Sequence, residues 1–287
     1  MRYRYLRFPG GKTKAVTFSY DDGLQTDVRL CKLLEKYGCK GTFNINSRWL
    51  ANDESGYNIT KEQLHTVILD GGHEVAVHGA QHVAPGNART IDALVDALEC
   101  RRELEKMTGR IIRGMAYPDS GITVMNNGAS YLRIKHYLTD LDIDYSRSLA
   151  ADNDRFRLPE DWHNWIPTAH HDNPNILDWA KRFVQMDINS FYAPDRYPRL
   201  FYIWGHTYEF ERRNNWEHIE ELCRMFSACP DVWFATNMEI CQYVKAYEAL
   251  QFNVDNTLAY NPTNQTVWLD SDGKVFEIAP GATVTIG

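Results

Sequence analysis

The sequence has no long apolar run, and no stretch reaches the roughly 20 consecutive apolar residues that a membrane-spanning helix needs. It also lacks a secretory signal, because residues 1–7 carry positive charge without the apolar segment that should follow. We therefore expect a cytoplasmic protein that does not engage a membrane. A secreted parent whose signal had been removed would give the same pattern.

Positive charge is scarce as well. Lysine and arginine number 31 against 38 aspartates and glutamates, so the formal net charge is −7. Nucleic-acid binding requires a basic face, and this balance argues against a nucleic-acid partner. It fits a neutral or cationic sugar better than an anionic one. The 44% hydrophobic and 24% charged fractions are close to the globular average and give no indication of disorder.

Closely spaced cysteine pairs are absent too, since none of the six cysteines forms a Cys-x-x-Cys motif. Their even number would allow disulfides, but most fall on predicted helices, and we expect buried thiols instead. The six are Cys31, Cys39, Cys100, Cys223, Cys229 and Cys241.

One motif that is present consists of two adjacent carboxylates at a predicted strand end. The strand covers Ala15–Tyr20 and is followed by Asp21, Asp22 and Gly23. This sequence is also ordinary turn chemistry, because Asp bonds its own backbone and Gly tolerates positive φ. As a strand end, it would present both acids at one rim of a sheet.

The second motif is a histidine pair. A predicted strand, residues 73–77, ends in His78 and His82. If the backbone coils there, both imidazoles lie on one side. Two imidazoles and one carboxylate leave a zinc position open for water and substrate. Either motif alone could be structural, but both at strand ends predict a metal-dependent hydrolase with the second aspartate free for proton chemistry.

Strands alternate with helices along most of the chain. The helix predicted for Asp27–Tyr37, which stops at Gly38, follows the first strand directly. Such alternation predicts a mostly parallel sheet covered by helices. The other predicted helices are 61–70, 90–107 (with Thr90 as N-cap and Gly109 as its stop), 126–138, 175–188, 216–226 and 238–249, and the other strands are 40–46, 111–117, 200–205 and 232–235.

The composition changes near residue 251. Turn signals separate short alternating runs at 266–269, 275–278 and 283–286, which predicts a small β appendage. About thirty-five residues cannot easily bury a core alone, so this segment should pack on the preceding domain. We expect a catalytic domain over 1–250 and the appendage over 251–287.

Together these motifs resemble the polysaccharide deacetylase family, metal-dependent carbohydrate esterases that share the NodB-homology domain. The resemblance spans roughly residues 10–245. It implies a distorted (β/α) barrel in which Asp21 is the catalytic base and Asp22, His78 and His82 bind the metal. Ser19-Tyr20 before the acids departs from the family pattern but leaves the Asp-Asp-Gly core intact.

The family's third motif is altered here. The resemblance implies that Tyr117 lines the substrate groove and that its backbone N–H binds the oxyanion. The arginine that normally steadies the base has no aligned counterpart. Arg113 could replace that arginine only if the turn brings its side chain to the base. Arg113 could equally be an ordinary surface cation.

The remaining motifs lie further along the chain. The resemblance implies that Trp165 walls the pocket, although it could equally be a core residue, and that His206, at the end of strand 200–205, is the general acid. Glu209 and its aromatic neighbours could contact a sugar. The segment 168–172, rich in potential ligands, could reach the site or occupy a loop.

The function implied is removal of N- or O-linked acetyl groups from a carbohydrate by metal-activated water. A site with two histidines and one aspartate accepts a divalent ion, with Zn²⁺ favoured over Co²⁺, Mn²⁺ or Fe²⁺. Two alternatives remain, a related amide hydrolase acting on a small non-glycan amide and a non-catalytic carbohydrate-binding protein on the same scaffold. The sequence predicts neither the particular acetylated substrate nor the oligomeric state.

Overall fold

The computed structural model describes residues 3–149 and 153–287. Within these residues the main sheet has eight strands, all parallel, in the order β6-β5-β4-β3-β2-β8-β7, with β9 also paired to β2. The strands are β2 (Lys14–Asp21), β3 (Gly41–Ile45), β4 (Glu74–Val77), β5 (Gly114–Ala116), β6 (Tyr145–Arg147), β7 (Ala169–His170), β8 (Arg199–Gly205) and β9 (Val232–Phe234).

Strand β2 is the centre of this sheet, and every residue in it is buried. It pairs with β8 along most of its length. On its other edge, β9 pairs with its first half and β3 with its second half. Because parallel strands bring their carboxyl ends to one edge, the residues that follow β2, β4 and β8 meet there.

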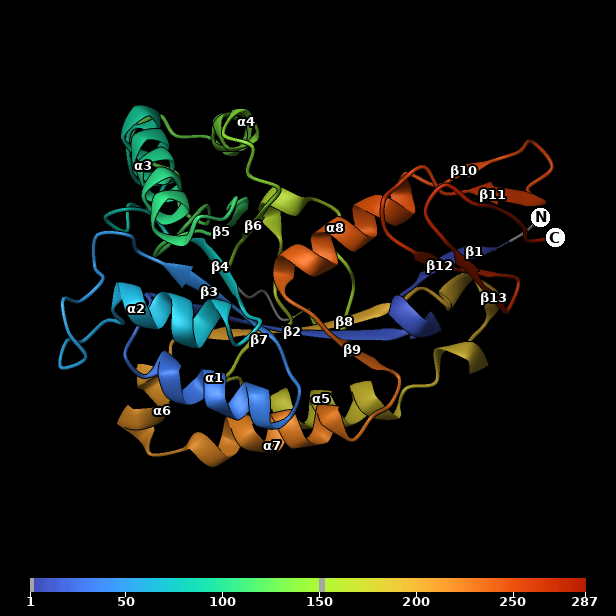
Figure 1. Cartoon of the computed structure of the whole chain (residues 1–287), viewed down its shortest axis with the longest axis horizontal. Coiled ribbons are helices and arrows are strands. Elements are labelled where there is room, and N and C mark those ends of the chain that lie inside the picture. Colours follow the sequence, from blue (N-terminus) through green and yellow to red (C-terminus); the bar gives the residue numbers. More distant parts are fainter. Residues whose placement is uncertain (1–2, 150–152) are drawn as a thin grey trace.

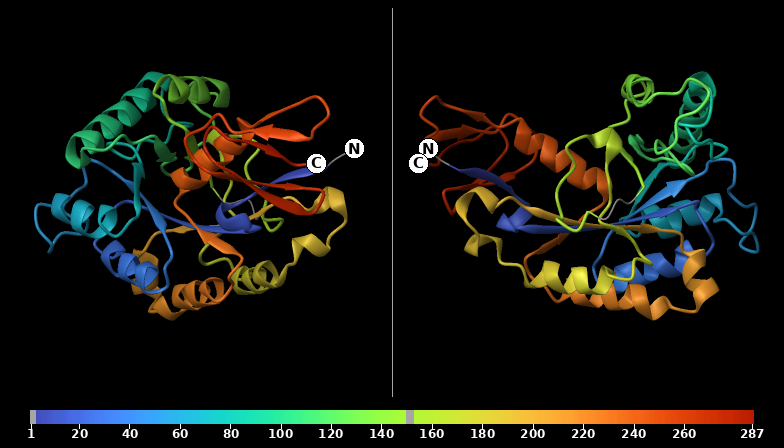
Figure 2. Two further views of the ribbon diagram at one scale, coloured as in Figure 1. Left: turned by 45° about the vertical axis from the view of Figure 1, so that its right-hand side comes forward. Right: turned by 180° about the vertical axis from the view of Figure 1, so that it is seen from behind.

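The sheet curls until its two ends are joined by one segment. At Trp165 the chain forms a parallel bridge to Arg147 of β6. Three residues later, the N–H of Thr168 donates to the carbonyl of Tyr202 in β8 at 2.8 Å, and β7 follows directly. The predicted distorted barrel is thus confirmed (Figures 1 and 2).

Helices cover the sheet on both sides. In Figure 1, α1, α5, α6 and α7 lie below the sheet and α8 lies above it. The helices are α1 (Asp27–Lys36), α2 (Lys61–Gln63), α3 (Thr90–Thr108), α4 (Tyr131–Asp140), α5 (Ile176–Gln185), α6 (Tyr208–Arg213), α7 (Trp216–Ser227) and α8 (Asn237–Glu248). Short helical turns are η1 (Pro9–Gly11), the π-type η2 (Leu64–Leu69), η3 (Trp162–Asn164), η4 (Ile188–Ser190) and η5 (Ala193–Asp195).

Most predicted helices match, and the departures occur at their ends. Helix α4 begins at residue 131 rather than 126, because the Ser130 side chain caps it by accepting from the N–H of Arg133. The N-cap of α3 is Arg89, not Thr90. Gly109 ends that helix in the left-handed conformation, as predicted. The predicted helix 61–70 is α-helical for one turn and then widens into η2.

The C-terminal segment forms antiparallel strands in two small sheets, of order β1-β12-β13 and β10-β11-β14. Strand β1 comes from the start of the chain, so both termini lie at this end of the molecule (Figure 2). The domain boundary at residue 250 therefore stays a prediction. The strands are β1 (Arg4–Arg7), β10 (Gln251–Phe252), β11 (Leu258–Tyr260), β12 (Val267–Ser271), β13 (Lys274–Ile278) and β14 (Thr283–Thr285).

These sheets pack on the barrel through α8. Ala246 and Leu250, from α8 and the residues just after it, share a buried apolar cluster with Leu269 and Ile278 of the small sheets. A buried ion pair of 2.6 Å between Arg7 Nη2 and Asp270 Oδ2 adds a polar link between β1 and β12. The N-terminal strand and the appendage thus form one packed unit with the barrel.

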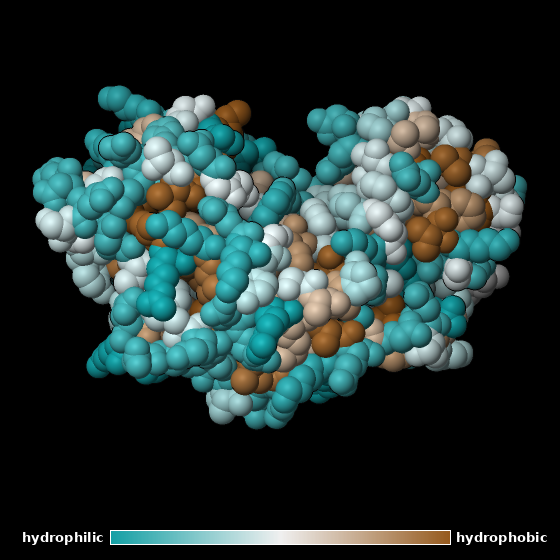
Figure 3. Space-filling view, turned by 60° about the horizontal axis from the view of Figure 1, so that its bottom comes forward, coloured by the Kyte–Doolittle hydropathy of each residue, from teal (hydrophilic) through white to brown (hydrophobic). Residues whose placement is uncertain are grey.

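One face of the molecule is mainly hydrophilic. Figure 3 shows teal side chains over most of the face drawn and hydrophobic residues in separate patches, some of them on the right-hand lobe, where the C-terminal strands lie. Exposed apolar residues there include Val254, Leu258, Tyr260 and Val275. All six cysteines, each among the described residues, are free thiols, and five of them are buried. Between residues 3–149 and 153–287, no helix combines the length and apolar character that a membrane crossing requires.

Candidate active site

The two aspartates lie in a tight turn at the end of β2. Asp21 is its last residue and is 2% exposed. Asp22 and Gly23 both have positive φ, at 79° and 63°, and the chain therefore turns sharply directly after the strand. Two successive residues that would alternate faces in a strand thus direct their carboxylates to the same rim.

The loop after β4 carries the histidine pair and is held by a helix. Gly79 has a φ of 80°, and a Cβ there would lie 2.3 Å from the Asp96 carboxylate of α3. That carboxylate accepts hydrogen bonds from the N–H groups of Gln81 at 2.8 Å and Val83 at 3.3 Å. His82 itself has a φ of 61°. Asp96 and the glycine thus fix the coil that places both imidazoles on one side.

The two imidazoles converge on one oxygen of Asp22. His78 Nε2 lies 3.5 Å and His82 Nε2 lies 3.6 Å from Asp22 Oδ1. This buried oxygen has no hydrogen-bond partner among the described residues. The carbonyl of Ala116 lies 3.0 Å from His78 Nδ1, and a proton there leaves Nε2 bare toward Asp22. The arrangement fits a tetrahedral divalent ion with one position left open.

Asp21 is fixed from both sides. Its Oδ2 pairs with Arg147 Nη2 at 2.5 Å, and its Oδ1 accepts from Asn44 Nδ2 at 2.8 Å. Burial alone would raise the pKa of Asp21, but the charge of Arg147, followed by His78 and His206, lowers it below its usual value. The carboxylate is therefore ionised at neutral pH and can accept a proton.

Arg147 was missed by sequence reasoning, which considered only Arg113. The side chain of Arg113 is 40% exposed and lies 3.3 Å from Asp144, so it does not reach Asp21. Arg147 ends the short strand β6, one strand beyond the expected position, and is 1% exposed. The only available signal was the basic residue in Tyr145-Ser146-Arg147 before a loop, and that pattern is too short to predict a strand.

His206 follows β8, as predicted, and faces Asp22. Its Nε2 lies 3.9 Å from Asp22 Oδ2, and its Nδ1 lies 3.6 Å from Glu209 Oε2. Burial alone would lower the pKa of His206, but the contact with Glu209 and the charges of Asp21 and Asp22 raise it above its usual value. The ring is thus favoured in the protonated form, which can donate a proton.

Tyr117 does not offer the oxyanion donor that was expected. Its backbone N–H already donates to the carbonyl of Arg147 at 3.0 Å, as part of the pairing between β5 and β6. Its hydroxyl donates to the carbonyl of His163 at 2.7 Å, and the residue is 2% exposed. The expected role fails here because the strand hydrogen bond uses the only N–H of the residue.

Trp165 is a core residue and does not wall the pocket. It is 1% exposed, and its ring meets Tyr145 and Tyr202 edge-on, with centroids 5.3 and 5.0 Å away. Trp204 in β8 lies nearer the site. The guanidinium carbon of Arg147 lies 4.4 Å from the centroid of the Trp204 ring, and that centroid is 6.1 Å from the His206 ring. Of the two tryptophans, Trp204 is the one beside the paired arginine and the expected acid.

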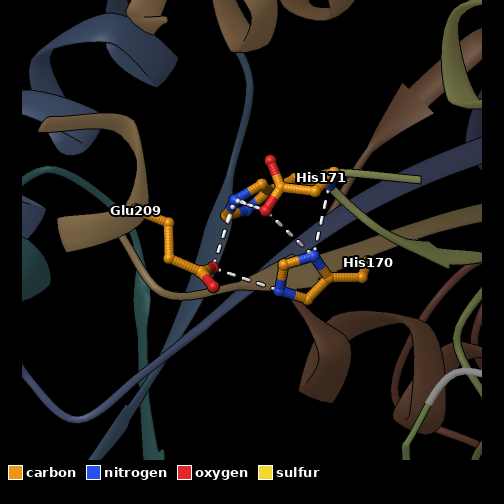
Figure 4. A group of neighbouring side chains, drawn as sticks. His170, His171 and Glu209 are labelled. Carbon is orange, nitrogen blue, oxygen red and sulfur yellow. Dashed lines mark hydrogen bonds and ion pairs between the residues drawn. The ribbon is translucent and has the colours of Figure 1, made fainter. Parts of the chain in front are cut away.

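The segment 168–172 reaches the site rather than occupying a remote loop. His170 and His171 both lie against Glu209 (Figure 4). Glu209 also contacts His206. Burial alone would raise the pKa of Glu209, but these three histidines lower it well below its usual range. Glu209 therefore faces inward and is not free at the rim to accept from a sugar hydroxyl, as had been expected.

A sequence model of the polysaccharide deacetylase family matches residues 3–131. This region contains the Asp-Asp-Gly turn and the histidine pair, and it ends before His206. The predicted resemblance to the polysaccharide deacetylase family is confirmed. The barrel, the aspartate pair and the histidine pair occur together in this chain. The comparison with curated proteins found no match.

Solved structures agree with this fold. A probable polysaccharide deacetylase from Pseudomonas aeruginosa PAO1 is 13% identical, with 82% of this chain and 92% of that chain covered and a TM-score of 0.58. Puue allantoinase is 12% identical, with 82% and 91% covered and a TM-score of 0.57. The Xyl-CE4 domain of a multidomain xylanase from the hindgut metagenome of Trinervitermes trinervoides is 14% identical, with 82% and 92% covered and a TM-score of 0.52. At these identities the likeness extends to the fold alone.

Proposed function

We propose that the protein is a metal-dependent hydrolase that removes acetyl groups from a carbohydrate. One observation carries the proposal. Asp22 Oδ1 is buried without a hydrogen-bond partner among the described residues, between the Nε2 atoms of His78 and His82. Beside it, Asp21 is held by Arg147 and is placed to act on a water molecule at the same rim.

Asp22, His78 and His82 would hold the metal. When bound there, a divalent cation supplies positive charge that acidifies water and polarises an acetyl carbonyl. Two imidazoles with one carboxylate suit Zn²⁺, and Co²⁺, Mn²⁺ and Fe²⁺ can occupy the same donors. The histidine tautomer that this requires is set by the carbonyl of Ala116.

Two further side chains of this chain would move protons. Asp21, ionised because Arg147 lowers its pKa, takes a proton from the attacking water. His206, whose pKa is raised by Glu209 and the two aspartates against the effect of burial, gives a proton to the departing nitrogen or oxygen. The pair therefore consists of a carboxylate whose pKa is lowered and an imidazole whose pKa is raised, and this opposition suits a base and an acid and favours turnover over simple binding.

Aromatic side chains at the rim favour a sugar as the substrate. Trp49 is 42% exposed and stacks on His82, with ring centroids 5.2 Å apart. The ring centroid of Tyr208 lies 5.5 Å from that of His206. Such flat apolar faces can pack on sugar rings while ring hydroxyls stay hydrated.

Acetate release by the purified, zinc-loaded protein from a panel of N- and O-acetylated sugars tests the proposal. We expect release that a chelator abolishes and that added zinc restores. The panel includes allantoin and linear amides, because Puue allantoinase shares this fold. Ammonia or acid release from an amide alone would favour the amide hydrolase. Bound metal without turnover on any substrate would favour the carbohydrate-binding alternative and contradict the proposal.

A further inference from the structure

A second group of metal-binding side chains lies beside the candidate active site. It consists of His170, His171, Asp172 and Glu209, whose candidate ligand atoms all lie within 4.8 Å of one another. The first three come from β7 and the residues directly after it, and Glu209 comes from α6 (Figure 4). None of the four is needed to hold the ion at Asp22, so the inference goes beyond the proposed deacetylation.

The side chains converge on one small volume. Glu209 Oε2 lies 3.1 Å from His170 Nε2 and 3.2 Å from His171 Nε2. Asp172 Oδ2 lies 3.3 Å from His171 Nε2. Two imidazoles and two carboxylates at such distances form a donor set that first-row divalent cations accept.

His171 is the decisive member of this group. It is completely buried, its Nδ1 has no hydrogen-bond partner among the described residues, and its Nε2 has only the carboxylates of Glu209 and Asp172 beside it. Its Nε2 points at these two carboxylates at contact distance. Two carboxylates that converge on one buried imidazole nitrogen are costly to desolvate, and a cation among these three groups would offset that cost.

The position of the His171 ring is fixed by its neighbours. Tyr20 and Phe210 both stack on it, with ring centroids at 5.7 and 4.2 Å. Gly205 at the end of β8 leaves the space that the ring occupies, because a Cβ at that position would lie 2.1 Å from His171 Nδ1. The ring therefore cannot swing away to find another partner, and Nε2 stays directed at the carboxylates.

We propose that His170, His171, Asp172 and Glu209 bind a second divalent cation of the zinc class. Solvent reaches the position, because the side chains of His170, Asp172 and Glu209 are 25%, 19% and 15% exposed. His170 Nδ1 now accepts the N–H of Asp172 at 3.2 Å, so binding of an ion through Nε2 requires that this hydrogen bond be given up and the ring proton move to Nδ1, where Asp172 Oδ2 lies 3.5 Å away. His206 lies between the two sites, with Nε2 toward Asp22 and Nδ1 toward Glu209.

The rival explanation is a network closed by protein charges alone. Arg213 of α6 forms an ion pair with Asp172 and could be the cation around which the cluster is built. Its side chain is 48% exposed and long, so a metal ion could displace it at small cost. The experiment must therefore separate a metal ion from an arginine.

Metal stoichiometry distinguishes them. The full-length protein is stripped with a chelator, loaded with ZnCl₂, desalted and analysed for zinc per chain. We expect two ions in the unmodified protein, one in His171→Gln and one in His78→Ala, with two retained in the exposed-histidine control His136→Gln. A single ion that persists in His171→Gln and is lost in His78→Ala would overturn the second site. A single ion lost only in His171→Gln would support it and contradict the first site instead.

Because His171 is buried, Asp172→Asn provides a second variant in case His171→Gln does not fold. Thermal unfolding in the His78→Ala background gives a readout that is independent of activity. Zinc should raise the Tm of His78→Ala by several degrees and should not raise that of His78→Ala/Asp172→Asn. Arg213→Gln should bind zinc at least as tightly as the unmodified protein, since Asp172 is released. Weaker zinc binding in Arg213→Gln, or equal Tm shifts in the two backgrounds, would overturn the proposal.

Discussion

Arg147 reaches Asp21 from a strand that begins more than a hundred residues later in the chain. It supplies the positive charge that keeps a 2%-exposed carboxylate ionised despite its burial. An arginine one strand away from the expected place can do this because β5 and β6 are adjacent and parallel, so that their carboxyl ends share one rim. If Asp21 is the base, as we propose, the chemistry requires a cation beside it, and a neighbouring strand can supply that cation.

Replacing Asp21 by Asn should separate proton transfer from metal binding. The amide cannot accept a proton from water, whereas Asp22 and both histidines remain, so we expect zinc content to persist and acetate release to fall about 10²- to 10⁴-fold. His78→Ala should lose the zinc as well as the activity. Zinc analysis and rate measurements on the two purified variants check this. Full activity in Asp21→Asn would rule out Asp21 as the base.

Replacing Arg147 by Met should change the pH profile as well as the rate. Without the guanidinium, the pKa of Asp21 is no longer held down, so the acid limb of kcat/KM should move to higher pH. At neutral pH we expect a loss of about 10²-fold at unchanged zinc content. Arg113→Met, which removes a surface cation, is the matched control. An unshifted acid limb in Arg147→Met would show that the arginine only fills space.

The sequence predicts those parts of the site that lie in contiguous motifs. Asp22, His78 and His82 converge as predicted, because each motif follows a strand of a parallel sheet. Arg147 could not be predicted, because its strand has only three residues. So short a strand shows no hydrophobic alternation in the sequence and is recognised only by its pairing with a neighbouring strand. Trp165 was ambiguous for a different reason, because a tryptophan beside a loop carries no signal of which way its ring turns.

Among the elements, the loops between strands and helices determine how well the ligands are positioned. The loop after β4 depends on α3, because the Asp96 carboxylate accepts two of its backbone N–H groups. Replacing Asp96 by Ala should loosen this loop and weaken zinc binding about 10- to 100-fold, as is usual for outer partners of metal ligands. Competition with a coloured chelator measures the affinity. Asp92→Ala, on the exposed face of the same helix, should leave the affinity unchanged.

His73, the residue directly before β4, should make the stability of the folded state sensitive to acid. Burial, with a smaller effect from Lys40, lowers the pKa of His73 to about 4 from 6.5, and its Nδ1 accepts the N–H of Gly41 at 3.1 Å. The folded state therefore binds this proton less tightly than the unfolded chain. The stability that His73 contributes is present above pH 6.5 and is lost as pH falls toward 4, by at most about 3 kcal/mol.

His73→Asn, whose side-chain oxygen can still accept from Gly41, should flatten the decline in unfolding free energy over that range. Urea unfolding at a series of pH values measures it, with the exposed His136→Asn as the control. If His73→Asn and the unmodified protein lost stability equally between pH 6.5 and 4, another group would have to be responsible.

At the scale of the whole molecule, the N-terminal strand links the appendage to the barrel. Strand β1 pairs with β12 and continues through η1 into β2, so the strand that carries Asp21 and the small sheets share one stretch of chain. The sequence predicted the appendage and its packing position in outline, from turn signals and the small size of the segment. The participation of β1 was not predictable, because four residues near a terminus give too short a pattern to assign a strand.

The Arg7–Asp270 pair is where this connection can be tested. Both side chains are almost fully buried, and burial lowers the pKa of Arg7 despite its charged partner. Asp270→Ala would leave a buried guanidinium without its counter-charge, which should cost about 3–5 kcal/mol of unfolding free energy. Arg7→Met/Asp270→Leu should recover much of this loss, because well-packed apolar residues can replace a buried ion pair.

Urea unfolding followed by tryptophan fluorescence and by residual activity should show one shared transition in Asp270→Ala, displaced to lower urea. The exposed Asp255→Ala should leave the midpoint unchanged. The shared transition is expected because loss of β1 pairing loosens the chain that leads into Asp21. An early fluorescence change that left activity at its original midpoint would mean that the appendage unfolds alone, and the barrel would then have to be stable without β1.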